Sequence, residues 1–393
     1  MSTDDNVMEQ QLRELFAEVP APAAPVSWGR APVAGSGRRI VWRFTLAVAV
    51  AVVVGAALVA VQLLRATYGP AVLVSAYPAA ADVTCSLPIA ALSADQTTGF
   101  VVFHNGRATF RPVQTSGTSY DPTLGRWVPV LPQLVAPDGR SYVEQDFANG
   151  QTIVRLVDAS GTRTVLKTSL PVGVFAHTSH GILLIEAATG RTPFDGSLTL
   201  LVLDPATAAV RPWPFAAPQP GVVRQAGGGS EAGYRREDDA IWMTAYYPSA
   251  DRTVVQRYDL ATGVTTQWFD GQTDGTGHLE VVATDGHGHP IVQLSDHDLF
   301  HTDPAHRSGI EQRTILLTAP HLETVLNQGR VGEPGVAGNL GPLSVNDGDR
   351  VWLAADDGTI WMYLPGSGLQ RMAKVVSTSN KGAPGVVVSG PCR

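Results

Sequence analysis

The chain has 393 residues, of which 44% are hydrophobic and 16% are charged, and its net charge is −7. This apolar content is enough for a substantial core, and the acidic balance without a basic stripe argues against a nucleic-acid-binding protein. The 40 glycines and 28 prolines favour short strands joined by tight turns over long helices.

The N-terminal part, residues 1–39, is predicted to be a cytoplasmic segment with an amphipathic helix over residues 4–19. Apolar side chains recur there at helical spacing and include Leu12, Leu15 and Phe16. A linker rich in proline and glycine follows. The three apolar residues are the expected contact surface for a cytoplasmic partner, and a helix without a partner is the open alternative.

A single transmembrane helix is predicted next, within residues 40–65. Residues 44–64 carry no charge, and a helix of this length, at about 1.5 Å per residue, spans the roughly 30 Å hydrocarbon layer. Four arginines lie between residues 30 and 43, and only one follows the segment before Asp82, so the positive-inside rule places the N-terminus in the cytoplasm. The run is too long, and too far along the chain, for a cleaved signal peptide. We therefore expect a single-pass protein of the cell membrane, with residues 44–64 in the lipid bilayer and residues 66–83 as a juxtamembrane linker.

Residues 84–393 are predicted to form an all-β extracytoplasmic domain built from repeats. One repeated element is a strand, an Asp-containing turn and a second strand, and it occurs around Asp158, Asp204 and Asp259. Each aspartate is expected to cap its own turn. A second element is a short apolar strand that recurs, in steps of 59, 50 and 60 residues, at 181–187, 240–246, 290–296 and 350–356.

Repeats of this length are typical of four-stranded propeller blades with loop insertions. The predicted fold is a β-propeller of about six blades, or seven, with residues 87–132 supplying one of them. A pair of β-sandwiches is the alternative, but it does not explain the repeated hairpin. Six tryptophans are expected to pack between blades, in preference to forming a sugar-binding platform: Trp127, Trp213, Trp242, Trp268, Trp352 and Trp361.

Five short sequences stand out in this domain: TCSLPIAALS (84–93), GFVVFHNGRATF (99–110), YDPTLGRWVPV (120–130), VAPDGRSYV (135–143) and the closing SGPC (389–392). Together they resemble uncharacterised, membrane-anchored repeat proteins of GC-rich bacteria, for which a propeller fold is predicted and no activity is assigned. The APDGR turn is similar, more weakly, to turns of TolB-like and WD40-like propellers. The resemblance implies a propeller and provides no catalytic residues.

The only two cysteines, Cys85 and Cys392, lie at the two ends of the repeat region. The first and last strands of a propeller are neighbours because the ring closes, and thiols outside the cytoplasm can be oxidised. We expect a Cys85–Cys392 disulfide that closes the ring, with two free thiols as the alternative. The count and spacing fit neither a CxxC motif nor a zinc site.

Six of the ten histidines lie between residues 278 and 306, interleaved with aspartates. His297, Asp298 and His301 could offer metal ligands, because imidazole and carboxylate groups bind zinc and related ions. However, the DGHGHP sequence at 285–290 is expected to be a glycine turn, and adjacent strand residues point to opposite faces. Solvated loop histidines are the favoured interpretation, so no metal or cofactor is predicted.

The sequence contains no GxSxG motif, P-loop, dinucleotide fingerprint or HExxH motif, so no catalytic residue is predicted. We expect a membrane-tethered binding module that presents one face to a protein or envelope ligand. One alternative is an envelope enzyme, a lyase or glycan hydrolase, with its site in the propeller channel. Another is a signal relay through the N-terminal helix. Polar side chains that converge in the channel would favour the enzyme.

Overall fold

A computed structural model of the protein describes residues 72–92, 97–113, 117–170, 172–186, 199–213, 223–226, 233–236, 238–247, 252–272, 278–296, 306, 308–377 and 385–393. The chain divides into two compact units, residues 1–69 and 70–393, and only the second contains described residues. The predicted cytoplasmic and transmembrane helices lie outside them. In the described part, no helix is long and apolar enough to cross a membrane, and the helical elements are two short 3-10 helices, η1 (Pro78–Asp82) and η2 (Pro132–Leu134).

The described strands form seven antiparallel sheets. The first has the order β27 (Gly385–Val388), β2 (Cys85–Leu92), β3 (Thr97–His104) and β4 (Arg107–Pro112). The second contains β5 (Ser119–Asp121) and β6 (Arg126–Val128). The third contains β7 (Tyr142–Ala148), β8 (Gln151–Asp158) and β9 (Gly161–Thr168).

The remaining four sheets have four or five strands each. The fourth contains β10 (Val172–Thr178), β11 (Gly181–Glu186), β12 (Thr199–Leu203) and β13 (Val210–Pro212). The fifth contains β14 (Val223–Ala226), β16 (Ala240–Tyr247), β17 (Arg252–Asp259) and β18 (Thr265–Gln272), and β15 (Tyr234–Arg235) also pairs with β16. The sixth contains β19 (His278–Thr284), β20 (Pro290–Ser295), β21 (Glu311–Ala319) and β22 (Leu322–Arg330). The seventh has the order β1 (Val72–Ala76), β26 (Gly368–Ser377), β25 (Thr359–Leu364), β24 (Arg350–Ala355) and β23 (Leu340–Asp347).

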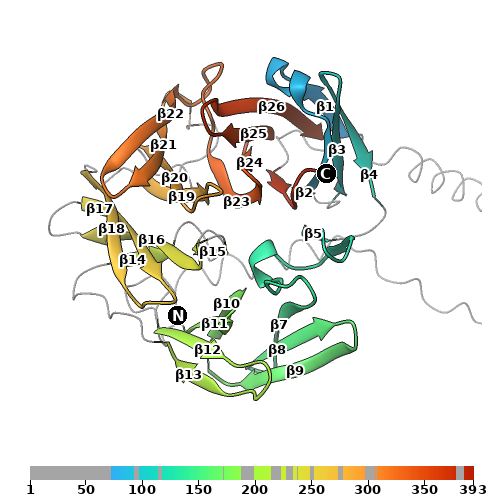
Figure 1. Ribbon diagram of the computed structural model, residues 1–393, viewed down its shortest axis with the longest axis vertical. Coiled ribbons are helices and arrows are strands. Elements are labelled where there is room, and N and C mark those ends of the chain that lie inside the picture. Colours follow the sequence, from blue (N-terminus) through green and yellow to red (C-terminus); the bar gives the residue numbers. More distant parts are fainter. Residues whose placement is uncertain are drawn as a thin grey trace, which may run out of the picture. The chain divides into compact units, whose positions relative to one another are not determined.

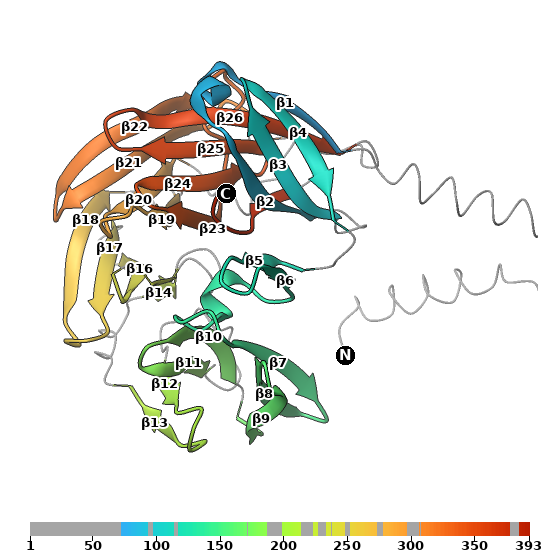
Figure 2. The ribbon, with the colours of Figure 1, turned by 45° about the vertical axis from the view of Figure 1, so that its right-hand side comes forward.

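The seven sheets follow one another round a ring, which Figures 1 and 2 show from two directions. Apolar clusters join each sheet to the next, from the second sheet through to the seventh, and the seventh to the first. The first and second sheets meet through edge-to-face contacts among Phe100, Tyr120 and Trp127. Because the last sheet packs on the first, the ring is closed. The described unit is a β-propeller.

The predicted tryptophans lie within these contacts. Trp352 stacks on Phe103 across the seventh and first sheets, with ring centroids 5.7 Å apart. Trp242 packs between the fifth and sixth sheets and Trp361 between the sixth and seventh. Large aromatic side chains fill the gaps between twisted sheets here, as expected.

The two ends of the described unit are joined in three ways. β27, from the C-terminal end, pairs with β2 and places Val388 opposite Ile89. β1, from the N-terminal end, pairs with β26 of the last sheet. The disulfide Cys85–Cys392 is present, with a Cα–Cα distance of 5.6 Å, and confirms the predicted pairing.

The contacts between the two ends of the ring, called the seam below, show that two boundaries expected from the sequence are wrong. The propeller begins before residue 84, since β1 and η1 lie within the segment predicted as a linker. Residues 87–132 are not one blade, because β27 supplies a strand of the first sheet and β5–β6 form a separate sheet. β27 and β2 are far apart in the sequence, so the pattern of residues 87–132 alone could not indicate that they pair.

The three predicted Asp turns are confirmed. Asp158 Oδ1 accepts a hydrogen bond of 2.7 Å from the backbone N–H of Ser160 at the β8–β9 turn. Asp204 and Asp259 accept equivalent bonds of 2.8 Å within the β12–β13 and β17–β18 turns. The HNGR hairpin also forms, with φ of 50° at Asn105 and 70° at Gly106, the left-handed pair that a two-residue turn of type I′ requires.

Candidate functional site

A cavity of about 260 Å³ lies where segments from opposite parts of the ring meet. Its wall comes from β5, from η2 and the turn after it, from β15, from the end of β23 and from the segment after β27. These segments belong to the second, fifth, seventh and first sheets, so the cavity is central to the ring. The polar lining residues that matter most below are Asp121, Arg235, Arg236, Ser344 and Asn346.

Two oxygen atoms in the cavity wall have unfilled hydrogen-bonding capacity. Asp121 is 4% exposed, and its Oδ1 accepts backbone N–H bonds from Thr123 at 2.7 Å and Leu124 at 3.1 Å. Its Oδ2, and Oδ1 of Asn346, are buried without a hydrogen-bond partner in the described part of the chain. Buried polar atoms in folded proteins usually have a partner in the protein or an ordered water, so these two oxygens are groups that a bound water or a ligand could satisfy.

Arg236 ties opposite sides of the cavity together. It follows β15 of the fifth sheet, and its guanidinium donates to the carbonyls of Val135, at 2.5 Å, and Pro132, at 3.3 Å. These carbonyls belong to the η2 region between the second and third sheets. Because the third and fourth sheets lie between them in the ring, this contact crosses the centre and fixes η2 against β15.

His177, near the end of β10, is 6% exposed and faces the charges of Arg236 and Asp138. Burial, and then the Arg236 charge, lower the pKa of His177 from 6.5 to about 4. The imidazole is therefore neutral in the folded protein at neutral pH.

This depressed pKa predicts a loss of stability in acid. Below pH 6.5 the unfolded chain binds a proton at His177 that the folded protein does not bind until about pH 4. Stability is fully present above pH 6.5 and should fall by about 3 kcal/mol as the pH drops to 4, since one pKa unit corresponds to about 1.4 kcal/mol. Urea unfolding at pH 7 and pH 4.5 should show a steeper loss in the wild type than in His177→Asn, which does not titrate. Equal pH dependence in the two proteins would contradict this assignment.

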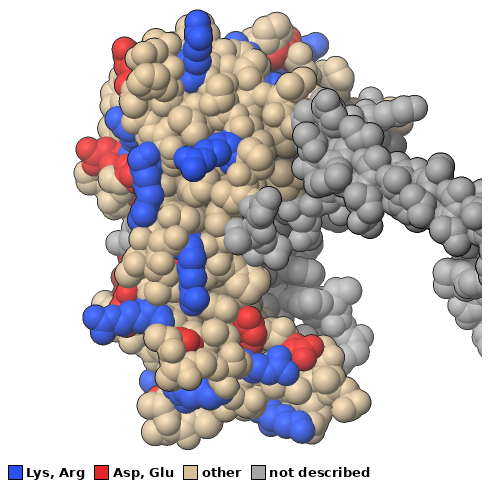
Figure 3. Space-filling view, turned by 90° about the vertical axis from the view of Figure 1, so that its right-hand side faces the viewer, with Lys and Arg blue, Asp and Glu red and all other residues tan. Residues whose placement is uncertain are grey.

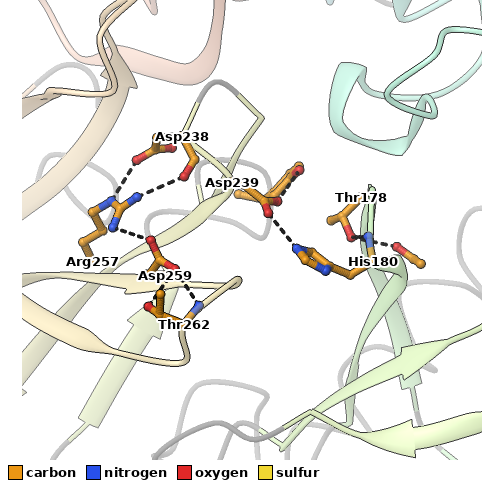
Figure 4. Close-up of polar contacts among 9 residues, drawn as sticks. Thr178, His180, Asp238, Asp239, Arg257, Asp259 and Thr262 are labelled. Carbon is orange, nitrogen blue, oxygen red and sulfur yellow. Dashed lines mark hydrogen bonds and ion pairs between the residues drawn. The ribbon is translucent and has the colours of Figure 1, made fainter.

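The turns beside the cavity are held by polar contacts, which Figure 4 shows. His180 Nε2, in the β10–β11 turn, lies 2.6 Å from Oδ2 of Asp239, before β16, and so links the fourth sheet to the fifth. Arg257 of β17 binds both Asp238 and Asp259, each at 3.0 Å. The segment between Arg236 and β16 is therefore held to the fourth sheet through Asp239 and to β17 through Asp238.

One described cluster has the chemistry of a metal site. Asp285, His287 and His289, in the turn between β19 and β20, each offer a ligand atom, and these atoms lie within 4.8 Å of one another. The turn packs against the β23–β24 turn and against Asp238, both of which follow cavity-lining segments.

The structure describes some of the site residues predicted from the sequence and not others. Cys85 and Cys392 are brought together. The low-ranked metal candidates His297, Asp298 and His301, and the predicted partner-binding residues of the N-terminal helix, lie outside the described residues. Asp121, Arg235, Arg236 and Asn346 were not predicted, because they come from distant segments with no common motif. The alternation of histidines in DGHGHP was the one available signal for the cluster at Asp285.

The charged side chains on one face of the protein are shown in Figure 3. Lysines and arginines there stand mostly apart, with uncharged residues between them and acidic side chains near several of them. On this face the described residues therefore show no continuous basic stripe of the kind that follows a nucleic-acid backbone.

No protein-family model matches the chain, and no curated protein matches it. Solved structures with a similar fold include an oligogalacturonate lyase from Vibrio parahaemolyticus, with 9% identity, a TM-score of 0.44 and coverage of 79% of this chain and 100% of that one. Another is an oligogalacturonate lyase in complex with manganese, with 10% identity, a TM-score of 0.43 and coverage of 78% and 90%. A third is the β-propeller domain of the Trilobed protease from Pyrococcus furiosus, with 9% identity, a TM-score of 0.36 and coverage of 59% and 66%.

Proposed function

We propose that the propeller is an extracytoplasmic ligand-binding module whose recognition site is the central cavity. The observation that carries this proposal is the cavity of about 260 Å³ in which polar residues from the second, fifth and seventh sheets converge, among them Asp121 and Asn346. Arg235 and Arg236 add cationic groups to the same wall. The matching ligand is a compact group, free or at the end of an envelope molecule, that carries an anionic acceptor and hydrogen-bond donors.

The composition of the wall supports binding over catalysis. The described lining contains a single carboxylate, Asp121, and contains no histidine, cysteine or lysine. A glycan hydrolase generally uses two carboxylates, one on each side of the bond that is cleaved. A lyase needs a general base with a positioned acid or metal, and the described lining offers Asp121 but no histidine or lysine to act with it. The polar convergence that would have indicated an enzyme is present, but its residue types suit recognition better.

We also propose that residues 44–64 attach the propeller to the cell membrane as a single transmembrane helix. Residues 44–64 are uncharged and long enough to cross a bilayer, and the arginines before them favour a cytoplasmic N-terminus. A disulfide between Cys85 and Cys392 suits an oxidising compartment.

We further infer a seven-bladed ring, in which β5–β6 with η2 form a reduced second blade.

Photo-crosslinking tests the cavity directly. A crosslinking amino acid at Gln133, in the cavity wall, should capture a defined envelope component when the full-length protein is irradiated in its own membrane. The same amino acid at Thr109, exposed on the outer strand β4, should not capture it. Mass spectrometry of the captured species identifies the ligand.

A cavity-filling variant supplies the matched control. Ser344→Trp places an indole in the cavity wall and should reduce capture at position 133 by about tenfold or more, equivalent to about 1.4 kcal/mol of lost binding. Thr109→Trp adds the same side chain to the outer strand and should leave capture unchanged. Equal capture from positions 133 and 109, or capture at 133 that survives Ser344→Trp, would contradict a cavity site.

A further inference from the structure

The turn between β19 and β20 brings one carboxylate oxygen and two imidazole nitrogens together. Oδ2 of Asp285 lies 3.0 Å from Nδ1 of His289 and 3.8 Å from Nδ1 of His287. The two imidazole rings lie side by side, with centroids 5.8 Å apart and an interplanar angle of 23°. Both rings therefore direct the same type of nitrogen toward one oxygen.

The carboxylate is held in place by its other oxygen. Asp285 is 2% exposed, and its Oδ1 accepts backbone N–H bonds of 2.8 Å from both His287 and His289. The backbone N–H of Asp285 in turn donates to the carbonyl of His289 at 2.8 Å. Oδ1 is thus used to shape the turn, and Oδ2 is directed at the imidazoles.

Packing fixes the turn from both sides. A Cβ at Gly286 would lie 2.6 Å from the carbonyl oxygen of Gly348, and a Cβ at Gly288 would lie 2.7 Å from Cβ of Asp238. Gly288 also has a φ of +80°, which side chains rarely adopt. The three polar groups are therefore placed by the seventh and fifth sheets, and the arrangement is formed before any ligand binds.

The two oxygen–nitrogen distances are close to those in a zinc site, and all three ligand atoms lie within 4.8 Å of one another. Zinc binds imidazole nitrogen and carboxylate oxygen at about 2.0–2.2 Å, so ligand atoms in a tetrahedral site are about 3.3–3.6 Å apart. The separations of 3.0 and 3.8 Å lie on either side of this range. Two imidazoles and one carboxylate are also a ligand set that favours zinc and its neighbours over magnesium or calcium.

We propose that Asp285, His287 and His289 bind a divalent transition-metal ion, with zinc as the representative, in the turn between β19 and β20. The side chain of His287 is 63% exposed, so the fourth position of the ion faces solvent and is open to water or a ligand group. This inference goes beyond the proposed cavity function and does not depend on it, because none of the three ligands lines the cavity.

Calorimetric titration of the metal-free, full-length protein in detergent with ZnCl₂ tests the proposal. The wild type should bind zinc saturably, and the double variant His287→Ala/His289→Ala should lose one zinc equivalent. Asp285→Asn keeps an oxygen that can accept the turn hydrogen bonds but removes the charge, and should weaken that binding by about tenfold or more. Circular dichroism of each variant reports whether the fold is retained, and His287, being exposed, can also be replaced alone.

Two controls separate this site from other histidines. His104→Ala changes an exposed histidine in the β3–β4 hairpin and should leave zinc binding unchanged. His297→Ala/His301→Ala tests the histidines singled out by the sequence and should also leave this equivalent in place. An absence of saturable binding in the wild type overturns the proposal. So does a zinc equivalent that survives His287→Ala/His289→Ala.

Discussion

Replacing both cysteines by alanine should lower the free energy of unfolding by roughly 2–5 kcal/mol. The Cys85–Cys392 bond closes a loop across a sequence separation of 307 residues. In the chain-entropy model such a loop corresponds to roughly 5–6 kcal/mol, and native disulfides usually deliver less because the unfolded chain is not a random coil. Urea unfolding of the full-length protein, followed by tryptophan fluorescence, measures the change.

Reduction provides the matched control for this change. A reducing agent should destabilise the wild type as much as the double replacement does, and should have no effect on Cys85→Ala/Cys392→Ala. Part of the seam remains without the disulfide, because β27 still pairs with β2 and β1 with β26. The variant is therefore expected to fold, with a lower unfolding midpoint. Unchanged stability in both the variant and the reduced wild type would contradict the structural role of the bond.

Trp352→Ala should cost about 3–5 kcal/mol, because it leaves a large cavity at the contact between the last and first sheets. Trp352 is fully buried, stacks on Phe103 and belongs to the cluster that contains Leu87 and Val388. Its Nε1 has no hydrogen-bond partner in the described structure, so lost packing accounts for the whole effect. Urea unfolding at pH 7 measures the loss.

Phe147→Ala is the matched aromatic control. Phe147 lies on β7 and is 64% exposed, so its truncation should change stability by about 0.5 kcal/mol or less. A similar cost at positions 147 and 352 would show that the first and seventh sheets do not form a packed seam.

The repeating parts of the fold could be predicted because their causes are local. A turn capped by Asp158, Asp204 or Asp259 needs only the residues that follow it, and the hydrogen bonds are those expected. The apolar strands that recur every 50 to 60 residues in the sequence are β11, β16, β20 and β24, one in each of the fourth to seventh sheets. The expected closure of the ring predicted the Cys85–Cys392 disulfide, because the first and last strands of a closed propeller are neighbours.

The cavity could not be predicted, because it is a product of ring closure. Asp121, Arg235 and Asn346 are more than 100 residues apart from one another along the chain. They share a wall only because the second, fifth and seventh sheets present one end toward the same space. Spacing rules treat each strand separately and carry no information on such an arrangement.

The metal-ligand cluster was missed for a different reason. The rule that neighbouring strand residues face opposite sides does not apply to a tight turn, where Asp285 gathers the backbone N–H groups of His287 and His289. The same hydrogen bonds that make the turn bring both imidazoles to one carboxylate oxygen.

A binding site shared by the second, fifth and seventh sheets exists only if the two ends of the ring are joined. A peptide map of the full-length protein, alkylated and digested without reduction, tests this most directly. We predict one disulfide-linked peptide pair that contains Cys85 and Cys392. Two separately alkylated cysteines would show that the disulfide is absent, and would contradict this account of how the two ends of the ring are covalently joined.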